Sequence, residues 1–185
     1  YFPEDERFLY RSDKGGNEIW HIYLYDNGEV RDLTPGEEAR STFFGWSKDK
    51  KSFFYQSNSR DQRYNDLYEM DIASFESQMI FQNDESYNLS SISADKNLIA
   101  LNKTITRNNS DMYVFNRKTM ELSHLSEHEG DINYFPVGFS NDNSTLYFLT
   151  DDNSEFTYLK SYSLADKKAT TVVKSEWDIM YSYFS

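Results

Sequence analysis

The chain has 185 residues, with 31 Asp or Glu against 19 Lys or Arg, so its formal charge at pH 7 is −12. This negative charge repels phosphate groups and argues against nucleic acid and anionic membranes as partners. Fifteen Tyr, 14 Phe and 3 Trp supply apolar surface for a buried core, while the absence of Cys excludes disulfides, thiol catalysis and Cys-ligated zinc.

A motif recurs along the chain with a period of about 45 residues. It consists of an apolar residue, Ser, a spacer, Asp, a short polar turn and an apolar run. Residues 4–10 carry a worn copy, in which Phe8 lies 45 residues before Phe53. Clear copies follow at 46–55, 92–101 and 139–148, and Phe184-Ser185 begin the motif again. Such regular self-similarity is the mark of a repeat architecture.

Two further elements repeat in the same register. One occupies residues 22–26, 67–71, 112–116 and 159–163, and the other occupies residues 30–33, 77–81, 122–125 and 169–173. These segments are short, aromatic or β-branched, and separated by turn-forming residues, so we predict that they are strands. Asn27-Gly28 predicts a type I′ hairpin turn. The Ser and Asp of the motif are expected to cap backbone N–H groups in a tight bend.

Units of this length with three or four antiparallel strands are typical of β-propeller blades. We therefore predict an all-β fold, a single β-propeller segment over residues 1–185 with repeats at approximately 1–45, 46–91, 92–138 and 139–185. The chain starts without Met and stops inside a new copy of the motif, so we expect it to be part of a larger, seven- or eight-bladed propeller. A closed four-bladed ring and an unrelated β-sandwich are the alternatives.

The Ser-x-Asp turn, together with strands such as residues 67–71, resembles the repeats of TolB-like propellers and of the N-terminal propellers of prolyl oligopeptidase-family serine peptidases. The longer segments 46–68, 134–151 and 176–179 are more similar to the peptidases, and the first of them includes an Arg-Asp-x-Arg loop at residues 60–63. The family's usual Ser-Pro-Asp-Gly turn has lost both Pro and Gly in all three clear copies.

The resemblance implies a non-catalytic propeller segment that covers an α/β-hydrolase catalytic domain of the same parent chain. It also implies that the propeller admits small peptide substrates and keeps folded proteins from the buried serine. The alternative is a TolB-like protein-interaction scaffold with no enzymatic activity. No apolar run is long enough for a membrane span, and the compartment, whether cytoplasmic, periplasmic or secreted, stays open.

A serine peptidase of this kind needs a Gly-x-Ser-x-Gly nucleophile elbow. The closest matches, residues 45–49 and 138–142, have Asp in place of the second Gly and lie at the same phase of the repeat. Two copies of one turn are not two nucleophiles, so we predict no catalytic residue and no enzymatic activity for this chain by itself.

The remaining polar motifs predict no cofactor and no metal site. His124 and His128 have the i, i+4 spacing of a helical metal site, but residues 122–125 are predicted to be a strand that leads into a surface loop. Calcium-binding and phosphate-binding loop patterns are also missing from the sequence. Arg60, Asp61, Arg63 and Asp66 match loop residues of the resembled family, and intra-blade ion pairs are the favoured role for them. No binding residue is assigned.

Overall fold

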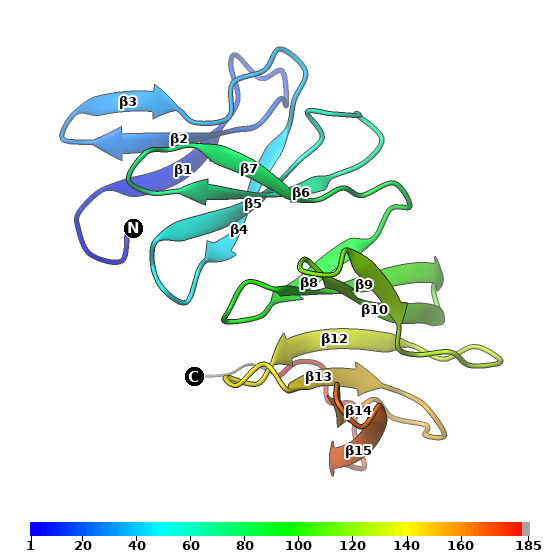
Figure 1. Ribbon diagram of the computed structural model, residues 1–185. Coiled ribbons are helices and arrows are strands. Elements are labelled where there is room, and N and C mark those ends of the chain that lie inside the picture. The colour runs from blue at the N-terminus through cyan, green and yellow to red at the C-terminus, as the bar shows by residue number, and fades with distance from the viewer. Residues whose placement is uncertain (183–185) are drawn as a thin grey trace. The chain divides into compact units, whose positions relative to one another are not determined.

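The computed structural model describes residues 1–182, and its regular structure there is entirely β (Figure 1). The all-β prediction is confirmed. Within this range no helix is long and apolar enough to cross a membrane. The strands are β1 (Phe8–Ser12), β2 (His21–Asp26), β3 (Glu29–Asp32), β4 (Ser41–Trp46), β5 (Ser52–Ser57), β6 (Asp66–Asp71), β7 (Ser77–Phe81), β8 (Asn88–Ile92), β9 (Leu98–Thr106), β10 (Asn109–Asn116), β11 (Glu121–His124), β12 (Tyr134–Phe139), β13 (Thr145–Thr150), β14 (Tyr158–Ser163) and β15 (Lys168–Val173).

The strands form four antiparallel meanders in chain order: β1–β3, β4–β7, β8–β11 and β12–β15. The first sheet has three strands and the others have four. We call them sheets 1 to 4. The chain divides into two compact units, residues 1–86 with sheets 1 and 2, and residues 87–185 with sheets 3 and 4. Phe184-Ser185, where the motif begins again, lie outside the described residues.

The first strand of each four-stranded sheet carries a β-bulge at the same place. The pairing register shifts between Phe43 and Gly45 in β4, between Leu89 and Ser91 in β8, and between Pro136 and Gly138 in β12. A bulge inserts one residue and so changes which side chains share a face of the strand. Phe43 and Trp46, three residues apart, thereby pack together with their ring centroids 5.5 Å apart.

The Ser-x-Asp motif forms the hairpin turn after each bulged strand. In the β4–β5 turn, the backbone N–H of Ser52 donates to Ser47 Oγ over 3.0 Å, and that of Lys51 donates to Asp49 Oδ1 over 3.1 Å. The same pairs of bonds recur in the other two four-stranded sheets, with Ser93 and Asp95 and with Ser140 and Asp142 as the acceptors. The predicted capping role is confirmed.

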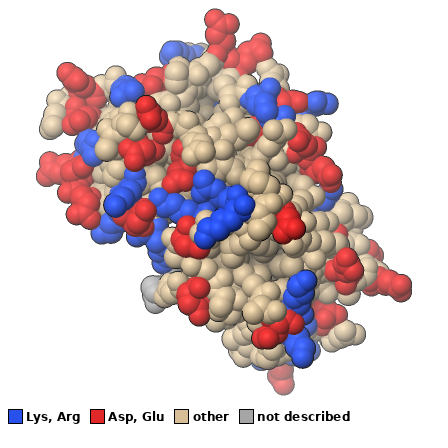
Figure 2. All heavy atoms as spheres, in the orientation of Figure 1, with Lys and Arg blue, Asp and Glu red and all other residues tan. Residues whose placement is uncertain are grey.

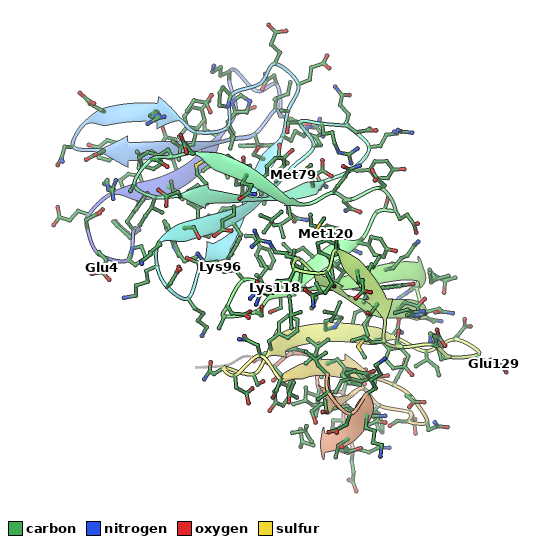
Figure 3. The ribbon with its side chains drawn as sticks, viewed as in Figure 1. Glu4, Met79, Lys96, Lys118, Met120 and Glu129 are labelled. Atoms are coloured by element: carbon green, nitrogen blue, oxygen red, sulfur yellow. The ribbon has the colours of Figure 1, made fainter. Side chains whose placement is uncertain are left out.

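Each of these turns contains one non-glycine residue in the left-handed region. The φ angles are +57° at Lys50, +63° at Lys96 (labelled in Figure 3) and +61° at Asn143. These residues follow the Asp of the motif, where the resembled family has Gly. The predicted hairpin turn at Asn27 and Gly28 has φ angles of +46° and +95°, as a type I′ turn requires.

The core of the first unit lies between sheets 1 and 2. Ile22 and Leu24 from β2 meet Phe53 and Tyr55 from β5, and Phe53 is completely buried. Burying an aromatic side chain of this size stabilises the fold by about 1.5–3 kcal/mol. Because these residues alternate along their strands, each sheet turns one apolar face toward its neighbour.

The second unit repeats this arrangement between sheets 3 and 4. Ala100 and Met112 from sheet 3 pack against Tyr134, Leu146 and Phe148 from sheet 4. Four of them, all except Tyr134, have at most 1% of their surface exposed. In each unit, therefore, neighbouring sheets are held together by a face-to-face apolar core.

Candidate functional site

A charged cluster surrounds Asp66, at the start of β6. Its carboxylate is fully buried and accepts two hydrogen bonds from Arg60, at 2.7 Å from Nε and 2.9 Å from Nη2. The backbone N–H of Asn83 donates a third over 2.7 Å. Arg60 Nη2 also contacts the carbonyl oxygen of Asn83 at 3.1 Å and Asp84 Oδ1 at 3.0 Å. The cluster therefore ties the β5–β6 loop to the segment that follows β7.

These contacts occupy the guanidinium of Arg60. Its hydrogen bonds to Asp66 raise the pKa of Arg60 above its ordinary value, so the side chain stays charged. A planar bidentate pair of this kind has a fixed geometry. The expected intra-blade ion pair is present, and the arrangement is suited to bracing a loop.

The second ion pair of this loop is local. Arg63 binds the carboxylate of Asp61, two residues earlier, with 2.7 Å between Nη2 and Oδ2. The hydrogen bond from the Arg63 side chain holds the pKa of Asp61 well below its usual range. Arg63 is 75% exposed, and such surface pairs contribute little to stability. The two Arg of the Arg-Asp-x-Arg loop thus have different surroundings, which the sequence pattern does not reveal.

The two segments that resemble nucleophile elbows are the capped hairpin turns. Ser47 is 3% exposed, and its hydroxyl lies 2.6 Å from Asp49 Oδ1 and 2.8 Å from the carbonyl oxygen of Ser52. Ser140 lies 2.5 Å from Asp142 Oδ1. Both hydroxyls are engaged in holding a turn, in agreement with their reading as two copies of one structural element.

A Ser-His-Asp cluster that the sequence did not predict lies in the second unit. Asp111 Oδ1 is 2.9 Å from His124 Nε2 and 3.1 Å from Ser126 Oγ, and Ser126 Oγ is 3.4 Å from the same His124 nitrogen. A catalytic triad needs the two ring nitrogens of the histidine to face different partners, the carboxylate on one side and the serine on the other. Here one nitrogen faces both. The backbone N–H of Met112 also donates to Ser126 Oγ over 2.8 Å, so the cluster fits a structural role.

The expectation that His128 lies on the surface is wrong. Its side chain is 9% exposed, and its Nδ1 donates to the carbonyl oxygen of Ser126 over 2.7 Å while lying 3.5 Å from Asp111 Oδ1. The ring is buried because both of these polar partners lie on the inner side of the loop. Across residues 1–182 no group of three or more His, Asp and Glu side chains is arranged to hold a metal ion.

The third histidine, His21, is also buried. Its Nδ1 lies 2.7 Å from Asp32 Oδ2 and its Nε2 lies 2.9 Å from the carbonyl oxygen of Gly36. The ring therefore ties β2 to the end of β3 and to the loop beyond it. Figure 2 shows acidic and basic side chains interspersed over the visible face, so the charge of −12 does not form one acidic field there.

Comparison with known proteins gives one consistent result. The family described as the N-terminal β-propeller domain of prolyl oligopeptidase matches residues 2–183. Dipeptidyl aminopeptidase BIII of Pseudoxanthomonas mexicana is 26% identical over 177 residues, which cover 92% of this chain and 25% of that protein. The chain thus spans a quarter of the length of this curated relative.

The solved structures show the same fold at low sequence identity. A structure from a study of two prolyl endopeptidases matches with a TM-score of 0.66 and 14% identity, covering 92% of this chain and 27% of that one. TolB from Acinetobacter baumannii matches with a TM-score of 0.62 and 14% identity, covering 92% of this chain and 42% of that one. Together with the family match, these likenesses confirm the β-propeller prediction.

Proposed function

This chain belongs to the family of prolyl oligopeptidase N-terminal β-propeller domains, and from this membership we propose that it is the non-catalytic propeller segment of a serine peptidase. In this role it shields the active site and restricts access to small peptides. Its partners are the α/β-hydrolase catalytic domain of the same parent chain and the peptide substrates that pass the propeller.

One observation carries the proposal. The family match is continuous over residues 2–183, although the chain spans only a quarter of a peptidase relative. The matching part is the propeller, so catalysis is assigned to the part of the parent protein beyond the match. The engaged hydroxyls of Ser47 and Ser140 support this division, because both already serve a turn.

The packing suits a barrier. Each unit joins two sheets through a close-packed apolar core, and the buried Asp66 cluster braces a loop at the end of its sheet. Close-packed interiors resist deformation. A wall of such sheets can exclude a folded protein while leaving room for an extended peptide.

The test uses the full-length parent protein. We expect a fluorophosphonate probe to label it at one serine and to leave the isolated 185-residue chain unlabelled. We also expect kcat/KM to fall steeply as peptide substrates grow longer, with folded proteins left uncut. An unlabelled parent protein, or hydrolysis that does not depend on substrate size, would contradict the proposal.

A matched pair of variants tests the barrier itself. Asp66→Asn removes the buried negative charge of the Arg60 cluster and one of its two acceptor oxygens, whereas Asp61→Asn removes only the charge of the exposed pair with Arg63. In the parent protein, Asp66→Asn should raise the hydrolysis of long peptides relative to short ones, and Asp61→Asn should leave that ratio unchanged. Equal ratios of long-peptide to short-peptide hydrolysis in both variants and the wild type would show that the propeller does not select substrates by size.

The second candidate function is a TolB-like scaffold that binds protein partners without enzymatic activity. The likeness to TolB from Acinetobacter baumannii favours it, although at 14% identity this likeness shows the fold alone. A parent protein that the probe does not label, and that instead forms a stable complex with another protein, would support this candidate.

A further inference from the structure

The turn between β2 and β3 holds the only asparagine of the chain that is followed by glycine, Asn27-Gly28. Asp26 pairs with Glu29, so Asn27 and Gly28 form the whole turn, and both are exposed. The N–H of Gly28 has no acceptor among the described residues. The Asn27 side chain and the backbone nitrogen that follows it are therefore open to solvent.

This pair of residues is the least hindered setting for a reaction of an asparagine side chain with the backbone. The nitrogen of the next residue attacks the side-chain carbonyl carbon, and glycine has no Cβ atom to obstruct the five-membered ring that forms. The surroundings of Gly28 are free as well, since a Cβ atom added there would meet no heavy atom within 4 Å. Neither the next residue nor its neighbours obstruct ring closure at Asn27.

Asn153, in the loop between β13 and β14, is a matched asparagine within the same chain. It is exposed, and its φ angle is +50° against +46° at Asn27. The Nδ2 of Asn153 donates to the side chain of the aspartate before it over 2.8 Å, and at Asn27 the same bond measures 2.9 Å. The two sites differ in the next residue, because Ser154 follows Asn153 and its N–H donates to the carbonyl oxygen of Asp151 over 3.0 Å.

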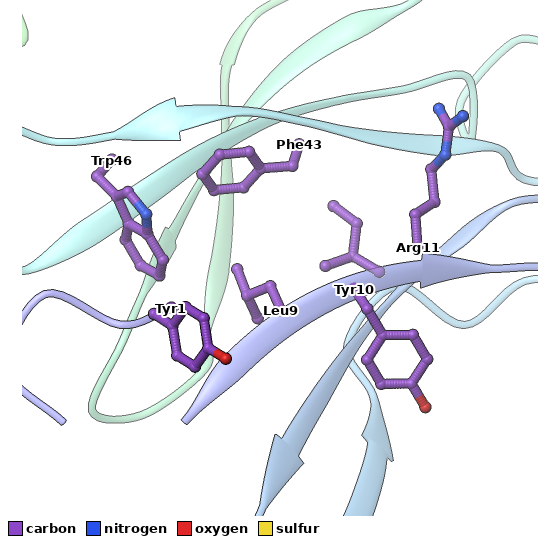
Figure 4. A pocket seen from close by; sticks show the side chains of 7 residues that line it. Tyr1, Leu9, Tyr10, Arg11, Phe43 and Trp46 are labelled. Atoms are coloured by element: carbon purple, nitrogen blue, oxygen red, sulfur yellow. The ribbon is translucent and has the colours of Figure 1, made fainter. Parts of the chain in front are cut away.

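The end of the β2–β3 hairpin can open while the rest of sheet 1 stays packed. Figure 4 shows Leu9 of β1 turned toward Phe43 and Trp46 of β4, and Ile22 and Leu24 of β2 are buried in the same core. Strand β3 lies at the edge of the sheet beside β2, and its first three residues are exposed. Exposed segments of this kind open locally at a low cost in free energy.

We propose that Asn27 is a site of spontaneous deamidation, through a succinimide, when the end of the β2–β3 hairpin opens. Ring closure requires rotation about the Cα–C bond of Asn27, out of the type I′ conformation. The deprotonated nitrogen of Gly28 bonds to Asn27 Cγ and the Cγ–Nδ2 bond breaks. The proton lost by Gly28 returns to Nδ2 through water, so the amide group leaves as ammonia. Water then adds to either carbonyl carbon of the ring, which opens to aspartate or isoaspartate, and nothing is oxidised or reduced.

Isoaspartate at position 27 changes the backbone itself. Its side-chain methylene becomes part of the main chain, so the turn gains one atom between the paired residues Asp26 and Glu29. A two-residue type I′ turn has no place for that atom. The modified hairpin therefore loses its pairing next to the turn, and either product adds one negative charge beside Asp26. The inference does not depend on whether the parent protein is a peptidase.

The test incubates the 185-residue chain at neutral and at mildly alkaline pH, both in buffer and in urea. Tryptic peptides are analysed by mass spectrometry, and isoaspartate is detected through its methylation by an isoaspartyl methyltransferase. We expect progressive conversion of Asn27 to both products, faster at the higher pH and faster in urea, while Asn153 stays unmodified in buffer. Asn27→Gln should remove the isoaspartate signal.

Two variants test the opening of the hairpin. Val30→Gly weakens β3, where Val30 pairs with Tyr25, and should speed the conversion of Asn27 about two- to fivefold, the effect of the usual glycine penalty in a strand. Thr170→Gly makes a comparable change in the edge strand of sheet 4 and should leave the rate unchanged.

Four results would overturn the proposal. The first is an Asn27 that stays intact in buffer while the chain in urea is fully converted. The second is conversion of Asn153 at the rate of Asn27, which would remove the role of Gly28. The others are equal rates in buffer and in urea, and equal rates in Val30→Gly and the wild type, since either would show that the hairpin does not control the reaction.

Discussion

The left-handed lysine of the β4–β5 turn offers a direct test of how these hairpins are built. Lys50 has a φ angle of +57°, and a residue with a Cβ atom in this region is strained by about 1–2 kcal/mol. Glycine relieves that strain but loses about 0.5–1 kcal/mol through the greater freedom of the unfolded chain. The ion pair of Lys50 with Glu4 adds little, since the two side chains are 56% and 72% exposed.

We therefore expect Lys50→Gly to raise the free energy of unfolding by about 0.5–1 kcal/mol, which raises the melting temperature of a chain of this size by about 1–4 °C. The neighbouring Lys51→Gly is the matched control. Its φ angle is not positive, so it should only lose stability. Both are measured by urea denaturation and thermal unfolding.

Asn143→Gly refines the test. Asn tolerates the left-handed region, and Asn143 Oδ1 accepts a hydrogen bond from the N–H of Ala94 over 2.8 Å. This substitution should be neutral or destabilising despite the similar φ angle. If Lys50→Gly destabilises the chain as much as Lys51→Gly does, the strain argument is refuted.

Three further predictions follow from buried or hydrogen-bonded groups. Asp66→Asn should lower the free energy of unfolding by about 2 kcal/mol in urea denaturation, because a buried acceptor of three hydrogen bonds is weakened; a change below about 0.5 kcal/mol would contradict this. The hydrogen bond from Ser140 lowers the pKa of Asp142 in the folded chain from its ordinary 3.8. The ionised carboxylate therefore contributes its full stability above pH 3.8 and loses it as the pH falls through the pKa of the folded state. In acid titrations followed by circular dichroism, Asp142→Asn should lose less stability than the wild type below pH 3.8. Burial raises the pKa of Tyr134 from 10.0 to about 12, so the stability that its neutral hydroxyl contributes is present below pH 10.0 and is lost as the pH rises to about 12. Tyr134→Phe should therefore lose less stability than the wild type between pH 10.0 and about 12. Equal losses in the two proteins over this interval would contradict the raised pKa of Tyr134.

The parts of the fold that the sequence predicted are those set by local chemistry. The hydrogen bonds of the Ser-x-Asp turns join residues at most five positions apart, so the repeat could be found from a short pattern. The strands after each turn were also evident, because β5, β9 and β13 are apolar runs. The family, too, was identified from these repeats.

The first strand of each four-stranded sheet was harder to predict. Strand β8 reads Asn-Leu-Ser-Ser-Ile, which is short and polar, and its bulge breaks the alternation that marks a strand.

The Asp111 cluster was missed for another reason. It joins Asp111 to Ser126 and His124 across the pairing of β10 with β11, and the register that places Tyr113 opposite His124 is not encoded in any short motif. The separate environments of Arg60 and Arg63 depend on tertiary contacts in the same way.

The hairpin turns also show which part of the motif carries the structural information. Pro and Gly of the family's usual turn are missing, yet the three turns keep the same hydrogen bonds, so the Ser and Asp acceptors are sufficient. Sheet 1 has a different turn. At the offset of 45 residues, Phe2 takes the place of Ser47 and Glu4 that of Asp49, while Asp5 Oδ1 accepts from the N–H of Arg7 over 2.9 Å. None of residues 3–6 has a positive φ angle. In the hairpins that join the first two strands of the four-stranded sheets, the left-handed residue therefore accompanies the pair of Ser and Asp acceptors, without glycine.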